Sequence, residues 1–165
     1  MSISISITSI NARAPYLVQS ENGYSFVFFT DWGHKYEIGF LEDYTLGDDG
    51  QIFQFFISAL DNLRLRQDEK VKQTIIVVLE EFFKNDNVSI LYICDSSDGR
   101  QAIRNRLFSI WFSRYSNKTL FSLEQRSLEV NSQKYFISLL SKIDCPATLE
   151  RINTLDQLMH SLEQK

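Results

Sequence analysis

The sequence predicts an α+β fold: a central mixed sheet, mostly antiparallel with one parallel strand pair, flanked by helices. Three observations lead to this. Residues 24–60 contain apolar, strand-length stretches separated by glycine-containing turns. Residues 88–94 form a nearly continuous apolar run, which is typical of a strand covered on both faces. A helical apolar stripe lies between these two regions, and strands joined through a helix are expected to be parallel neighbours.

Length and composition favour one domain covering residues 1–165. Hydrophobic residues make up 44% of the chain and 13 residues are phenylalanine, which indicates an aromatic core. No stretch approaches the roughly 18 consecutive apolar residues of a membrane span, and no secretory signal opens the sequence, so a cytoplasmic protein without membrane contact is expected. Cys94 and Cys145 are predicted to be reduced thiols. The net charge of −4 argues against a nucleic-acid partner.

The first half of the chain is predicted to form a meander. The first ten residues alternate serine and isoleucine, so residues 1–15 are expected to be either an N-terminal arm or an edge strand. Residues 24–30 and 35–42 read as a hairpin, and residues 51–60 as a third strand. His34 lies at the hairpin tip and is expected to be exposed and without a catalytic role, and no metal site is predicted.

The second half is predicted to alternate helices and strands. Asp68 is a good N-cap for a helix ending near Lys84, and the strand of residues 88–94 follows it. A second helix is expected over residues 100–115. Residues 119–130 and 134–143 are expected to pair as a hairpin. A capping-box pattern, Thr154-x-x-Gln157, predicts a C-terminal helix over residues 154–165.

The candidate site lies where the strand of residues 88–94 ends, because ligands of such sheets gather beyond the carboxyl ends of the strands. Asp95 and Asp98 follow the strand, and Arg100 and Arg104 lie one helical turn apart on the face predicted to point inward. A buried guanidinium needs a partner. Two interpretations follow: the carboxylates pair with the guanidinium groups and fix the turn, which the short separation favours, or the arginines hold an anionic ligand.

The predicted order of three antiparallel strands, helix, strand, helix and hairpin resembles the GNAT acyltransferase fold over residues 24–143. In that family a glycine-rich loop before the first of these helices binds the pyrophosphate of coenzyme A, and the second helix often carries a tyrosine that donates a proton. Here the loop of residues 62–67 has no glycine, and Arg64 and Arg66 would supply the positive charge. Arg104, Arg106 and Phe108 lie near the depth at which that tyrosine is expected.

A second resemblance rests on residues 91–101, on residues 104–108 and on Trp111-Phe112. These segments are similar to a bacterial family of domains of unknown function, a resemblance that brings no activity with it. The preferred hypothesis is a non-enzymatic binding or regulatory module on a GNAT-like scaffold, without a cofactor. The alternatives are an atypical N-acyltransferase that uses acetyl-CoA or another acyl-CoA, and a nucleotide- or anion-binding enzyme. Expected partners are a protein or a small anionic ligand, and the N-terminal arm and edge strands are compatible with a homodimer.

Overall fold

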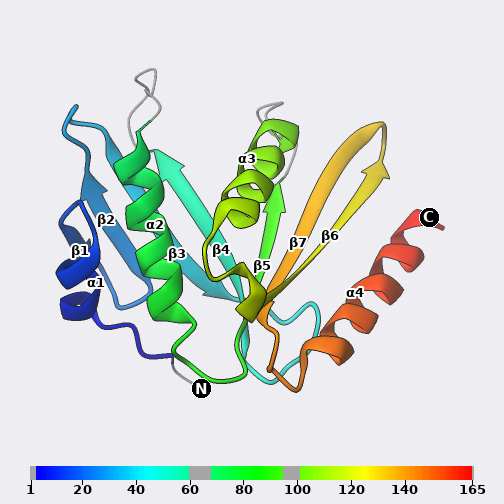
Figure 1. Cartoon of the computed structure of the whole chain (residues 1–165). Helices are drawn as coiled ribbons and strands as arrows, with labels where there is room; N and C mark the ends of the chain where they lie inside the picture. Colours follow the sequence, from blue (N-terminus) through cyan, green and yellow to red (C-terminus); the bar gives the residue numbers. More distant parts are fainter. Residues whose placement is uncertain (1–2, 60–67, 95–100, 165) are drawn as a thin grey trace. The chain divides into compact units, whose positions relative to one another are not determined.

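The structure is a computed structural model that describes residues 3–59, 68–94 and 101–164; residues 59, 94, 101–105 and 107 are described by their backbone only (Figure 1). The secondary-structure elements follow one another in this order: α1 (Ile7–Arg13), β1 (Val18–Ser20), β2 (Ser25–Phe29), β3 (Lys35–Glu42), β4 (Ile52–Ala59), α2 (Glu69–Phe82), β5 (Ser89–Cys94), α3 (Gln101–Arg114), a short 3-10 helix (Lys118–Leu120), β6 (Phe121–Val130), β7 (Gln133–Lys142) and α4 (Thr148–Glu163).

The strands form one mixed sheet of seven in the order β1-β2-β3-β4-β5-β7-β6. Strands β4 and β5 are parallel, with Ile52 opposite Ser89, whereas β1–β2, β2–β3, β5–β7 and β6–β7 are antiparallel. The predicted fold class and the predicted order of strands and helices over residues 24–143 are therefore confirmed. Within the described ranges, no helix combines the length and the apolar character needed to cross a membrane.

The chain divides into two compact units, the first comprising Met1–Leu41 with Phe55–Asp86 and the second Glu42–Gln54 with Asn87–Lys165. In the first unit, helices α1 and α2 cover one face of the sheet (Figure 1). Phe40 of β3 stacks on Phe82 of α2, with the ring centroids 4.4 Å apart, and Phe28 of β2 stacks on Tyr16. Side chains alternate along a strand, so the neighbours of Phe28 in β2 and of Phe40 in β3 point to the opposite face of the sheet.

Helix α1 corrects one prediction. Residues 7–13 are helical, so the expectation of an edge strand in the N-terminal segment is wrong. The side chain of Ser6 accepts a hydrogen bond from the main-chain N–H of Ser9 and so caps the helix, and Ile10 is buried. Ser9 and Arg13 reach the buried carboxylate of Glu81 on α2, at 2.9 and 3.4 Å, which fixes α1 against α2. A two-residue alternation of serine and isoleucine was thus overridden by capping and tertiary contacts.

In the second unit, α3 and α4 lie on opposite faces of β5. Leu91 belongs to an apolar cluster with Leu155 and Met159 of α4, while the neighbouring Tyr92 packs its ring against Phe108 of α3, 4.9 Å between centroids. The prediction that this strand is covered on both faces is confirmed as far as Tyr92, whereas Ile93, on the same face as Leu91, is 40% exposed. Strands β6 and β7 pair along their whole length around a turn at Asn131 and Ser132, both of which have positive φ.

Helix α4 begins at Thr148, six residues before the predicted capping box. The hydroxyl of Thr154 donates to the carbonyl of Glu150 inside the helix, so Thr154 does not cap a helix start. The stripe that faces the core begins with a buried arginine, Arg151, and continues with Leu155 and Met159. A charge at the first position of this stripe concealed the first turns of the helix.

Candidate functional site

The residues singled out in the sequence mostly lie outside the part of the chain that the structure describes. This holds for Arg64, Arg66, Asp95, Asp98 and Arg100. The backbone of Arg104 lies in α3, but its side chain also falls outside the described part. The ion-pair and anion-binding interpretations of these residues therefore stay predictions.

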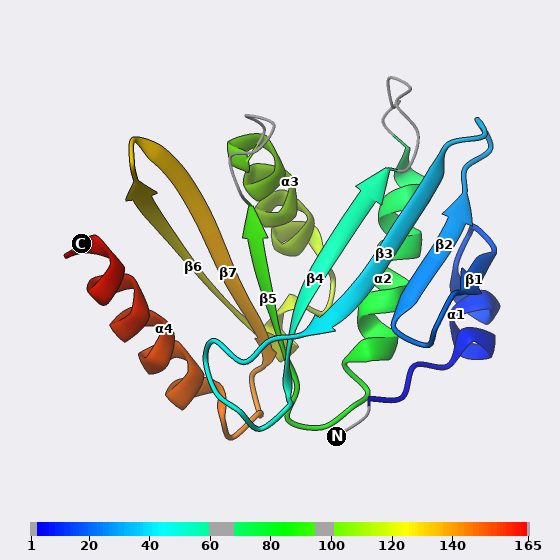
Figure 2. The ribbon, with the colours of Figure 1, turned by 180° about the vertical axis from the view of Figure 1, so that it is seen from behind.

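The described residues contain a groove in the first unit, lined mostly by side chains on the sheet face opposite α1 and α2. Figure 2 is turned toward this face of the sheet. The volume of the groove is about 410 Å³. Strands β2 and β3 supply most of it, with Phe56 from β4. The residues that line it are Glu21, Asn22, Tyr24, Ser25, Val27, Lys35, Glu37, Phe40, Leu41 and Phe56.

The register of β2 and β3 determines which side chains reach this groove. Val27 lies opposite Glu37 and Ser25 lies opposite Gly39, and all four positions belong to the face away from the helices. Gly39 leaves room for the ring of Phe56. A Cβ at position 39 would lie 2.5 Å from Cζ of Phe56 and 2.9 Å from the carbonyl oxygen of Tyr24. The glycine is therefore needed for the close approach of the Phe56 ring, not for an unusual backbone angle.

A carboxylate occupies the floor of the groove. The hydroxyl of the buried Ser25 donates a hydrogen bond of 2.6 Å to Oε1 of the half-buried Glu37. Among the described residues, this hydroxyl is the hydrogen-bond partner of the Glu37 side chain. Two residues before Glu37 on β3, the ammonium of Lys35 lies 6.0 Å from the centroid of the Phe29 ring, within reach of a cation–π interaction.

The turn before β2 forms the rim of the groove. The side-chain oxygen of Asn22 accepts hydrogen bonds from the main-chain N–H groups of Tyr24 and Ser25, at 3.0 and 2.9 Å. Gly23 has a φ of +85°, which glycine adopts without strain. This Asn-Gly turn places Glu21 and Tyr24 beside the groove.

A second polar cluster lies at the start of α2, in the first unit. The hydroxyl of Tyr16 donates to Asp68, the N-cap residue of α2, over 2.5 Å, and accepts from the main-chain N–H of Asp31. Lys70 forms an ion pair of 2.8 Å with Asp31. Burial, together with the hydrogen bond to Asp68, raises the pKa of Tyr16 to about 12. The cluster joins the segment between α1 and β1, the β2–β3 turn and the start of α2.

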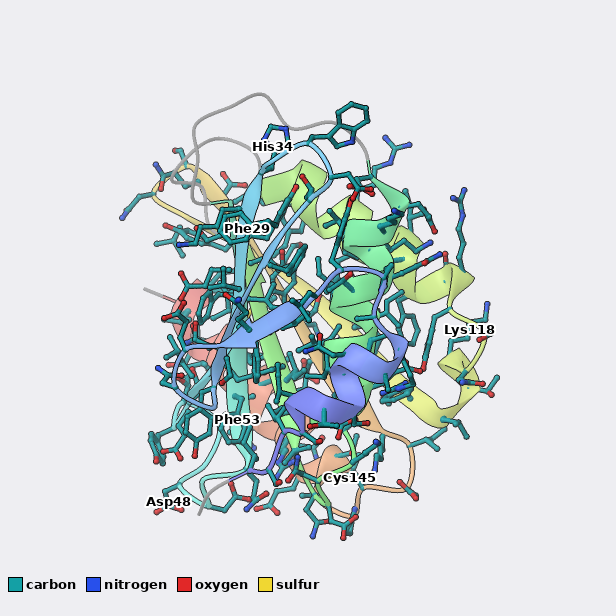
Figure 3. All side chains as sticks on the ribbon, turned by 90° about the vertical axis from the view of Figure 1, so that its left-hand side faces the viewer. Phe29, His34, Asp48, Phe53, Lys118 and Cys145 are labelled. Carbon is teal, nitrogen blue, oxygen red and sulfur yellow. The ribbon has the colours of Figure 1, made fainter. Side chains whose placement is uncertain are left out.

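His34 is buried, with 8% of its surface exposed, so its predicted exposure is wrong. Figure 3 shows it at the β2–β3 turn, at the same end of the hairpin as Phe29. The main-chain N–H of His34 donates to the hydroxyl of Thr30, which folds the turn back on itself. In the described ranges, no three His, Cys, Asp or Glu residues are grouped so that they would hold a metal ion.

Arg151 is a buried charge that the sequence did not reveal. Its Nη1 donates to the carbonyl of Asn87 and the hydroxyl of Ser89, both at 2.7 Å, and its Nη2 donates to Asp49 at 3.0 Å. The hydroxyl of Ser89 lies 2.6 Å from that of Ser141 on β7. Arg151 therefore links α4, the start of β5 and the loop before β4. The signal for it in the sequence is its place four residues before Leu155 on the buried stripe of α4.

Comparisons with known proteins give one family and one solved structure. Residues 67–164 match the model of a family described as a family of unknown function, DUF6169. The resemblance to a family of unknown function is thus confirmed. No curated protein matches the chain. Among solved structures, the chain is similar to a CoA-dependent acyl-homoserine lactone synthase, MesI, with a TM-score of 0.41 and 11% sequence identity over 85% of this chain and 71% of that chain.

Proposed function

The chain belongs to the family of unknown function DUF6169, and we propose that it is a non-enzymatic binding module whose groove in the first unit holds a segment of a protein partner. The match to the family begins at residue 67, whereas the groove is built from residues 21–56. The proposal therefore rests on the residues of this chain. It requires no cofactor.

The observation that supports it is the character of the sheet face that carries the groove. Phe29 and Leu41 lie on this face and expose 54% and 59% of their surfaces. Between them, the floor of the groove combines the buried Val27 with the Ser25–Glu37 pair. Exposed apolar side chains around a few fixed polar groups are typical of interaction surfaces on folded proteins.

The size and charge of the groove favour a protein segment as its occupant. A groove of about 410 Å³ lies in the range of sites that hold a ligand larger than a single side chain. Two carboxylates, from Glu21 and Glu37, line it together with one ammonium group, that of Lys35. Electrostatic complementarity then favours a segment that carries positive charge.

The roles of the buried charged residues also support binding rather than catalysis. Glu81 holds α1 against α2, with Ser9 and Lys84 at 2.9 and 2.7 Å. Arg151 holds α4 against β5. Asp43 accepts hydrogen bonds from the main-chain N–H of Thr45 and the side chain of Gln54. Each of these groups is used to join elements, which is the structural role of most buried ionised side chains.

Selection from a random dodecapeptide library tests the proposal. Peptides selected on the wild-type protein are expected to lose most of their binding to Leu41→Asp, which places a carboxylate on the edge of the groove. They are expected to keep it with Leu149→Asp, a matched change at a leucine of α4 that is 69% exposed. Circular dichroism checks that both variants are folded. If the selected peptides bind Leu41→Asp as well as the wild type, the groove is not the binding surface and the proposal is wrong.

A further inference from the structure

We infer that the groove recognises a lysine side chain, with its ammonium group on the Glu37 carboxylate and its alkyl stem against Phe56, on the side of Leu41. The inference rests on the proposed function, because it names the residue of the partner that enters the groove. Four features of the described residues support it: the state of the Glu37 carboxylate, the aromatic side chains beside it, the place of Lys35 and the apolar floor.

The first feature distinguishes an ammonium from a guanidinium. Ser25 already donates to Oε1 of Glu37 at 2.6 Å, and this hydrogen bond fixes the orientation of the carboxylate. A guanidinium binds a carboxylate best with two parallel N–H groups, one to each oxygen. An ammonium is a compact point charge and needs only one free oxygen. The arrangement of Ser25 and Glu37 therefore favours lysine over arginine.

The second feature is the aromatic lining. Tyr24 and Phe56 both line the groove that contains Glu37. A cation near the face of an aromatic ring is attracted by the electrons of the ring, and this attraction grows when water is excluded. The position of Phe56 is restricted, because its ring lies against the Cα of Gly39. A cation at Glu37 thus has aromatic neighbours on residues that need little rearrangement to receive it.

The third feature concerns the cation that the chain itself supplies. Lys35 lies on the same face as Glu37, two residues earlier on β3. Its ammonium is placed near the ring of Phe29, 6.0 Å from the centroid. The ammonium of Lys35 therefore lies toward the Phe29 end of the groove, and the Ser25–Glu37 pair forms the acidic part.

The fourth feature is the floor beneath the stem. Val27, opposite Glu37 in the register, is only 3% exposed, so the apolar surface open to a ligand comes from Phe56 and from Leu41, which is 59% exposed. Leu41 extends this surface along β3. Four methylene groups on such a surface contribute burial that a short cation lacks, which favours lysine over a small amine.

Three fluorescein-labelled pentapeptides test the inference: Gly-Leu-Lys-Leu-Gly and the same peptide with norleucine or arginine in the centre, all with blocked ends. Norleucine keeps the alkyl stem and lacks the charge. Fluorescence anisotropy is expected to give the lysine peptide an affinity about tenfold higher than that of the norleucine peptide and higher than that of the arginine peptide. Raising the salt concentration is expected to reduce the difference.

Two variants separate the role of Glu37 from that of total charge. Glu37→Gln is expected to lower the affinity for the lysine peptide about tenfold and to leave the affinity for the norleucine peptide unchanged. Glu163→Gln removes the same charge from the exposed end of α4 and is expected to change neither affinity. If the lysine and norleucine peptides bind the wild type equally well, and Leu41→Asp binds neither, the lysine inference is wrong and the proposed function stands. The lysine inference is also wrong if none of the three pentapeptides binds while the selected dodecapeptides bind the groove. If neither the pentapeptides nor any dodecapeptide binds the groove, the proposed function is wrong as well.

Discussion

Ser25 and Glu37 form a hydrogen bond of 2.6 Å across two antiparallel strands, from the hydroxyl of β2 to the carboxylate of β3. They are diagonal neighbours, because Ser25 lies opposite Gly39 and not opposite Glu37. On this face of the sheet, the space beside Gly39 is taken by the ring of Phe56, which comes from β4.

Replacing Ser25 by alanine is expected to lower the affinity for the lysine peptide about fivefold, because the Glu37 carboxylate loses the hydrogen-bond donor that orients it. Ser25→Thr keeps a hydroxyl and is expected to restore most of the affinity. Ser127→Ala, at an exposed serine of β6, is the control. Fluorescence anisotropy measures all three. Affinity that is unchanged in Ser25→Ala would show that the hydroxyl has no part in recognition.

Gly39→Ala is expected to destabilise the protein by about 1–3 kcal/mol, because the new Cβ overlaps with the Phe56 ring and the carbonyl of Tyr24. In a Phe56→Ala background the same change is expected to cost less, since only the main-chain contact remains. Urea unfolding of the two single variants and the double variant measures this coupling. Strictly additive free energies of unfolding would mean that Phe56 does not lie against Gly39.

Arg151→Ala is expected to lower the free energy of unfolding by about 3 kcal/mol, because the carbonyl of Asn87 and the hydroxyl of Ser89 lose a buried donor. Asp49→Asn is expected to cost about 1 kcal/mol or less, because solvent screens this carboxylate, whose side chain is 51% exposed. Urea unfolding compares them. Equal costs would indicate that the ion pair, and not the two neutral acceptors, is the main contribution of Arg151.

Tyr16 is expected to make the protein sensitive to alkali. The pKa of Tyr16 is raised to about 12 in the folded state, whereas a tyrosine in the unfolded chain has a pKa of about 10. The folded protein therefore holds this proton more tightly than the unfolded chain. The stability that results is complete below about pH 10 and is lost as the pH rises through about 12. Tyr16→Phe is expected to be less stable at neutral pH by about 1–2 kcal/mol and to lose less stability over the alkaline range. Urea unfolding at a series of pH values tests this, and parallel pH profiles for the two proteins would contradict it.

The fold was predictable because its signals are local. The alternation in β3, the continuous apolar run of β5 and the N-cap of α2 each specify one element, and Asp68 does accept a hydrogen bond from the main-chain N–H of Lys70. The hairpin of β6 and β7 was predicted for the same reason. The order of these elements then predicted the parallel pair of β4 and β5.

The groove was not predictable because it depends on contacts between residues far apart in the sequence. Alternation places Glu37 on the polar face of β3, but nothing local shows that Ser25 reaches it or that Phe56 lies over Gly39. Arg151 was missed for the same reason, because its partners come from two segments far from it in the sequence, the start of β5 and the loop before β4. The N-terminal helix was mistaken because its period-two pattern is a strand signal, and its cap and its contact with Glu81 are tertiary information.

The most direct test of the account is a nuclear magnetic resonance titration of the ¹⁵N-labelled wild-type protein with the lysine pentapeptide. The account predicts that the main-chain amides of β2 and β3 shift and saturate together, with the largest changes at Ser25, Val27 and Glu37. Saturating shifts confined to residues outside β2, β3 and β4 would contradict it.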